Sequence, residues 1–141
     1  MERVDISDLA DRYYTSLSGG EKQRVHLARV LAQLTSESKR PKLLLLDEPT
    51  SALDLLHQEV ALQIAHSLCH EQQFGVIVVL HDLNLAASWA DRIVLMKDGQ
   101  IHHSGTPSDV LTQPILREIY DLDVLVLEHP KTGRPIITTD R

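Results

Sequence analysis

Residues 43–48 read LLLLDE, a short unbroken apolar run that ends in two carboxylates. A run of this length and composition is typical of a strand that is buried on both faces of a parallel sheet. A helical pattern follows from about Leu55 to Gln72, and a second apolar run, VIVVL, occupies residues 76–80. Strand, crossover helix and strand together predict a parallel α/β unit.

Polar side chains stand where these two strands end. Asp47 and Glu48 close the first run, and His81 directly follows the second. Open α/β sheets bind ligands beyond the C-terminal ends of their strands, so we expect the three side chains to share one edge. Adjacent strand residues point in different directions, which suits Asp47 to a magnesium ion and Glu48 to an attacking water. Taken alone, an Asp-Glu pair at a strand end is more often a solvated turn.

A helix start precedes the first strand. Residues 18–21 read SGGE, in which the Ser18 hydroxyl and the Glu21 carboxylate form the two sides of a capping box. The two glycines would leave backbone N–H groups unshielded at the positive end of the helix, where a phosphate could dock. A plain helix start is the alternative. The apolar residues recur at helical spacing as Val25, Ala28, Leu31 and Ala32.

The remainder of the chain is expected to alternate short helices and hairpins. The sequence does not indicate the role of the C-terminal hairpin. The expected starts and turns are an N-cap at Asp82, a hairpin turn at Asp98-Gly99, helix starts at Thr106-Pro107 and Gln113-Pro114, and a terminal hairpin of residues 122–127 and 135–139.

Composition narrows the class of protein. The chain has 141 residues, of which 43% are hydrophobic and 24% charged, as expected of a globular domain. No apolar run is long enough to span a bilayer and the first residues do not form a signal region, so we expect a cytoplasmic protein. The lone Cys69 excludes an internal disulfide. A formal charge of -6 disfavours direct binding of nucleic acid.

Four motifs, in one order, resemble those of the ATP-binding-cassette (ABC) ATPases. Residues 17–24, LSGGEKQR, are similar to the signature motif, and residues 43–48 to the Walker B strand with its glutamate. Residues 49–54, PTSALD, resemble the D-loop, and His81 the switch histidine. The resemblance implies a partial P-loop NTPase core, α/β, with parallel strands, flanking helices and a C-terminal β-hairpin.

The resemblance also implies a role for each matching residue in a head-to-tail dimer that ATP closes and hydrolysis reopens. Glu48 and His81 would be catalytic, Glu48 as general base or water positioner and His81 at the γ-phosphate. Asp47 would hold Mg²⁺ through water. The residues implied to bind ATP or to link the two sites are Ser18, Gly19, Gly20, Gln23 and Asp54.

One element of the family is missing from the sequence. No glycine is followed by Lys-Ser or Lys-Thr at the spacing of the phosphate-binding loop, G-x-x-x-x-G-K-[ST]. We therefore expect a half-cassette that is inactive alone, with residues 1–40 ending the helical subdomain, 41–105 forming the core and 106–141 the C-terminal helices and hairpin. The long loop at residues 35–41 and the neighbouring sequence resemble importers of metal chelates, haemin importers above all, with cobalamin and siderophore importers close behind.

As a haemin importer subunit, the chain would pair with a second ATPase subunit and with membrane permease subunits, and indirectly with a periplasmic binding protein. It would lie on the inner face of the bacterial membrane and bind no nucleic acid. Two alternatives stay open. One is a non-transport ABC ATPase that acts on nucleic acid, and the other is a catalytically silent fragment that binds a full cassette.

Overall fold

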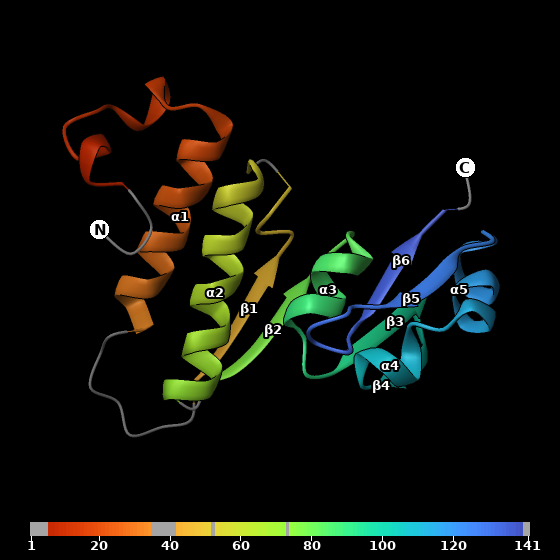
Figure 1. Ribbon diagram of the computed structural model, residues 1–141. Coiled ribbons are helices and arrows are strands. Elements are labelled where there is room, and N and C mark those ends of the chain that lie inside the picture. Colours follow the sequence, from red (N-terminus) through yellow and green to blue (C-terminus); the bar gives the residue numbers. More distant parts are fainter. Residues whose placement is uncertain (1–5, 35–41, 52, 73, 140–141) are drawn as a thin grey trace. The chain divides into compact units, whose positions relative to one another are not determined.

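The computed structural model describes residues 6–34, 42–51, 53–72 and 74–139 (Figure 1). The chain divides into two compact units between Leu80 and His81. The sequence-based boundary at residues 40 and 41 falls outside the described residues, and the division at 105 and 106 stays a prediction.

The first unit is built on the expected parallel pair of strands. Strand β1 (Leu43–Asp47) lies beside β2 (Gly75–Val79), with Leu43 opposite Gly75 and Asp47 opposite Val79. Helix α2 (Leu55–Gln72) connects them, as the helical pattern predicted. Before β1 come two short 3-10 turns, η2 (Ser7–Leu9) and η3 (Tyr14–Ser16), and helix α1 (Gly19–Leu34). In Figure 1, α2 lies next to the strand pair, and the same core includes α1.

Burial of β1 differs from the sequence prediction. Leu44 and Leu46 are buried in the core with α1 and α2, whereas Leu43 and Leu45 are 67% and 64% exposed. The prediction of a strand buried on both faces is therefore wrong for this structure. The reason is physical: within the described ranges, helices of the first unit pack on one face of the strand pair. Ala32 of α1 is likewise exposed, although its spacing placed it with the packed residues.

The second unit contains two antiparallel hairpins and three helices. Strands β3 (Ile93–Lys97) and β4 (Gln100–Gly105) form the first hairpin, and β5 (Leu125–Glu128) and β6 (Pro135–Thr138) the second. Asp98 and Gly99 have φ values of 52° and 75°, so both turn residues adopt the positive φ that a two-residue hairpin of type I′ requires. The helices are α3 (Leu83–Trp89), α4 (Pro107–Val110) and α5 (Gln113–Tyr120), which begin where the sequence predicted.

The C-terminal hairpin packs against α3, a role that the sequence did not disclose. The Asn84 side chain pairs with the backbone of Ile137 in both directions: its Nδ2 donates to the carbonyl at 3.0 Å, and its Oδ1 accepts from the N–H at 2.8 Å. Arg134 Nη1 donates to the carbonyls of Ala87 and Ala90, at 2.8 and 3.0 Å. A cation at the C-terminal end of a helix interacts favourably with the helix dipole. The hairpin thus secures both ends of α3.

A separate observation concerns membranes. Among the described residues, no helix combines the length and the apolar character needed to cross a bilayer.

Candidate functional site

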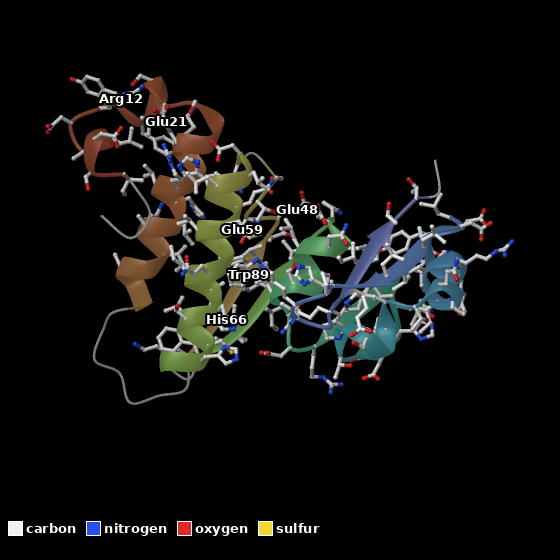
Figure 2. All side chains as sticks on the ribbon, in the orientation of Figure 1. Arg12, Glu21, Glu48, Glu59, His66 and Trp89 are labelled. Carbon is white, nitrogen blue, oxygen red and sulfur yellow. The ribbon has the colours of Figure 1, made fainter. Side chains whose placement is uncertain are left out.

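The start of α1 is held by the capping box that the sequence predicted. Glu21 accepts from the backbone N–H of Ser18 at 2.7 Å, and the Ser18 hydroxyl accepts from the N–H of Glu21 at 3.3 Å. Sequence reasoning missed Arg12, whose Nη1 donates to Glu21 at 2.7 Å (Figure 2). These contacts fix the turn that carries Gly19 and Gly20. By helix geometry, the first N–H groups of a helix have no acceptor inside it, so the turn can receive an anion.

The capping box of Ser18 and Glu21 leads to one prediction about how stability depends on pH. The backbone hydrogen bond from Ser18, then its hydroxyl contact, hold the pKa of Glu21 below its ordinary value of 4.5, and Arg12 adds to this. A carboxyl whose folded pKa is depressed stabilises the fold above its unfolded pKa, and this contribution is lost as pH falls through the folded pKa. We expect Glu21→Gln to lower the melting temperature at neutral pH, and the gap from the unmodified chain to close as the pH falls below 4.5 and through the folded pKa. Circular dichroism melts over a pH series would measure it.

Glu59→Gln is the matched control, because Glu59 is an exposed carboxylate on α2 that lies away from the box (Figure 2). A gap of the same size at every pH for Glu21→Gln would contradict an ionised capping box.

The backbone of Glu48 is held at several points directly after β1. Its N–H donates to the carbonyl of Val79 at 3.1 Å. Its own carbonyl accepts from the Gln23 side chain at 3.0 Å and from the Ser51 hydroxyl at 3.1 Å. Glu48 has a φ of 47°, in the left-handed region that few non-glycine residues occupy. Residues held in this region cluster at functional sites. The chain thus turns sharply at the end of the strand, leaving Asp47 exposed and the Glu48 side chain half-buried.

Asp54 begins α2 as its N-cap, which the sequence analysis did not foresee. Its Oδ1 accepts from the backbone N–H of His57 at 3.0 Å and from the His57 Nδ1 at 2.6 Å. The backbone hydrogen bond is the larger cause, and the ring contact the second, of a pKa for Asp54 below its ordinary value. The Gln58 side chain donates to the carbonyls of Thr50 and Leu53, at 3.2 and 3.1 Å. The segment between β1 and α2 is therefore tied to the first turns of α2.

His81 stands at the beginning of the second unit, two residues after the last residue of β2. It is exposed and precedes Asp82, whose carboxylate caps α3 by accepting from the N–H groups of Asn84 and Leu85 at 2.8 and 3.0 Å. The cap was predicted from sequence and is confirmed. That His81 shares one edge with Asp47 and Glu48 stays a prediction.

Asp47 and the glycine turn of α1 have the chemistry needed to bind part of a magnesium nucleotide. Mg²⁺ takes oxygen ligands, one or two of them carboxylates, together with waters, and Asp47 presents an exposed carboxylate at the end of a parallel strand. The glycine turn at the start of the 16-residue helix α1 offers backbone N–H groups to phosphate. Asp47 therefore fits Mg²⁺, and the glycine turn fits a phosphate group.

Comparison with known proteins agrees with this chemistry. The model of the ABC transporter family matches residues 1–51. Over 140 residues the chain is 51% identical to the hemin import ATP-binding protein HmuV of Escherichia coli O157:H7, a match that covers 99% of this chain. The chain is thus similar to the ATP-binding proteins of ABC transporters. The resemblance carried by the signature, Walker B, D-loop and switch-histidine motifs is thereby confirmed.

Solved structures of ABC proteins have the same fold as this chain. An inward-facing ABC transporter described as putatively of the metal-chelate type superposes with a TM-score of 0.80, at 29% identity, over 97% of this chain and 53% of that one. A dimeric ATP-binding cassette bound to ADP and Pi, in a post-hydrolysis state, gives a TM-score of 0.61 at 35% identity, over 74% of this chain and 44% of that one. The predicted α/β ABC ATPase fold is confirmed. The chain spans about half the length of the hemin import relative, 55% of it.

Proposed function

We propose that the protein is the ATP-binding subunit of an ABC importer and couples ATP hydrolysis to the uptake of hemin or another iron chelate. The observation that carries the proposal is the 51% identity, over nearly the whole chain, to a hemin import ATP-binding protein. The capped glycine turn and the carboxylates at the end of β1 support the chemistry, because phosphoryl transfer depends mainly on positioning and on charge stabilisation.

In the proposed mechanism two copies of the cassette close head-to-tail on ATP. The turn of Ser18, Gly19 and Gly20 binds the γ-phosphate of an ATP held mainly by the partner, and Gln23 is a further ATP-binding residue. Asp47 would hold Mg²⁺, and the ion would neutralise phosphate charge when bound. Glu48 orients the attacking water and accepts its proton. The remaining roles are those of His81, at the γ-phosphate, and Asp54, across the dimer.

The proposed partners are a second ATPase subunit, the permease subunits of the importer and, indirectly, a periplasmic binding protein. The subunit would be cytoplasmic and peripheral on the inner face of the bacterial membrane. A formal charge of -6 disfavours nucleic acid as a binding partner of the ATPase.

Reconstitution tests the proposal. We define the completed cassette as this chain joined to the N-terminal half of the hemin import relative, which supplies a phosphate-binding loop. Assembled with a hemin permease and its binding protein in proteoliposomes, the completed cassette is expected to hydrolyse ATP and to move hemin inward. Release of phosphate and uptake of hemin are the two measurements.

This chain alone is the control and is expected to bind Mg-ATP weakly and to show no turnover, because its sequence has no phosphate-binding loop. Turnover by the chain alone would contradict the half-cassette reading. ATP hydrolysis that responds to RNA or DNA and ignores the permease would favour the nucleic-acid alternative. Uptake of a siderophore or cobalamin in place of hemin would redirect the substrate assignment within the importer class.

A further inference from the structure

A row of polar contacts connects helix α1 to the D-loop through one histidine. On one side of the His57 ring, Nδ1 lies 2.6 Å from Asp54 Oδ1. On the other side, Nε2 contacts Arg24 Nη1 of α1. Arg24 and His57 are 33 residues apart in the sequence, so the contact joins α1 to the start of α2 in addition to the apolar core that both helices share.

The chemistry of the two neighbours fixes the state of the ring. A guanidinium can only donate hydrogen bonds and an ionised carboxylate can only accept them. Nε2 must therefore accept from Arg24 while Nδ1 carries the proton and donates to Asp54. Hydrogen bonds made by the two ring nitrogens are what select a histidine tautomer. The contacts thus require a neutral His57 ring that is protonated on Nδ1.

Apolar packing also joins these elements, because Leu53 packs against the core that includes Leu27 of α1. A cleft of about 240 Å³ lies between α1 and the segment after β1, and Arg24, Leu53 and His57 are among its lining residues. The contacts of Arg24 and His57 bridge these walls beside the apolar core. The His57 side chain is mostly enclosed, at 18% exposed, whereas the Asp54 side chain is 69% exposed. Asp54 is therefore held from inside and open on its outer side.

We propose that His57 is a positioning residue which, as a neutral ring protonated on Nδ1, ties Asp54 of the D-loop to Arg24 of the signature helix α1. The functional consequence rests on the proposed function: Asp54 would face the partner cassette while α1 carries the turn that serves the partner's ATP. His57 would then keep the two contact points of one subunit in a fixed relation, so that both meet the partner together.

Capping of α2 is the competing explanation for the pair of Asp54 and His57. It makes a different prediction, because the cap uses the backbone N–H of His57, which every residue except proline retains at that position. A purely structural role would therefore survive His57→Phe, which keeps the ring shape and the backbone donor. The proposed role would not survive, since phenylalanine can neither donate to Asp54 nor accept from Arg24.

Nuclear magnetic resonance on this chain tests the ring state directly. Long-range correlations between ring protons and ring nitrogens in the ¹⁵N-labelled protein are expected to show His57 as the Nδ1–H tautomer. Arg24→Gln is expected to shift the Nε2 signal. A ring protonated on Nε2, or an Nε2 signal that Arg24→Gln leaves unchanged, would overturn the proposed link.

Kinetics of the completed cassette test the consequence. A mutation far from the reacting atoms that misplaces a catalytic group by about 1 Å can lower the rate about 100-fold. We therefore expect His57→Phe to lower kcat by roughly tenfold or more and to leave the affinity for ATP within about twofold. His66→Phe makes the same change at an exposed position of α2 and should leave kcat unaltered (Figure 2). The melting temperature of His57→Phe should stay close to that of the control.

A double variant separates a link from two independent effects. If Arg24 acts through His57, then His57→Phe combined with Arg24→Gln should lose no more activity than His57→Phe alone, because contacting residues of one network are not additive. Losses that multiply would overturn the proposal. If the unmodified completed cassette hydrolyses no ATP, the proposed function fails, while the tautomer measurement still decides whether His57 joins Arg24 to Asp54.

Discussion

In the completed cassette, Glu48→Gln is expected to lower ATP turnover by about 100-fold or more, the range that general-base catalysis contributes, while ATP still binds. Glutamine keeps the shape of the side chain but loses the negative charge that orients the water and accepts its proton. Because hydrolysis is proposed to open the dimer, the closed, ATP-bound dimer should accumulate. Single-turnover phosphate release and size-exclusion chromatography with ATP would measure the two effects.

Several contacts that hold position 48 do not depend on its carboxylate. They involve the backbone of Glu48: the N–H donates to Val79, and the carbonyl accepts from Gln23 and Ser51. A change at the carboxylate leaves these backbone contacts in place.

The control for charge removal is Glu59→Gln, at an exposed site on α2 (Figure 2). Turnover of Glu48→Gln at the unmodified rate would show that another residue activates the water. Loss of ATP binding together with turnover would show that Glu48 acts on affinity instead.

Local patterns predicted the elements of this fold because each depends on a few neighbouring residues. The capping residues Ser18 and Asp82 and the turn at Asp98 all act through contacts within four positions in the sequence. The sequence pattern of β1 indicated a strand correctly but not which face is covered. Coverage depends on which helices pack against the strand, and a run of four leucines carries no information on that.

The contacts that organise the candidate site were beyond sequence reasoning because they join distant segments. Gln23 was assigned to nucleotide binding by its place in a motif, yet its amide reaches the Glu48 carbonyl, 25 positions away. Arg134 closes on the end of α3 from 44 and 47 positions away. An arginine or glutamine is compatible with many partners, so only the folded chain selects one. The N-cap at Asp54 did have a local signal, since aspartate is favoured directly before a helix, and the pattern beginning at Leu55 marked that helix.

Ser18→Arg is expected to prevent closure of the dimer while each subunit still binds nucleotide, the opposite of Glu48→Gln. Arginine places bulk and a cation at the exposed start of α1, where the partner's ATP is proposed to dock. Overpacking costs typically 1–3 kcal/mol at each contact, and a two-fold dimer repeats the contact, so the dimer should dissociate at least roughly 30-fold more readily. Size-exclusion chromatography with ATP should show dimer for Glu48→Gln and monomer for Ser18→Arg.

Two further variants separate bulk from the loss of the cap. Ser18→Ala removes the hydroxyl that accepts from Glu21 but adds no bulk, so it should destabilise the helix start by about 1 kcal/mol and still allow closure. Ser108→Arg adds the same side chain at an exposed position of α4 and should leave dimerisation unchanged. If Ser18→Arg closes as readily as Ser108→Arg, the start of α1 does not meet the partner subunit, and the role assigned to Ser18, Gly19 and Gly20 is wrong. If Ser18→Ala alone prevents closure, the hydroxyl contributes to the contact itself and the bulk argument is unnecessary.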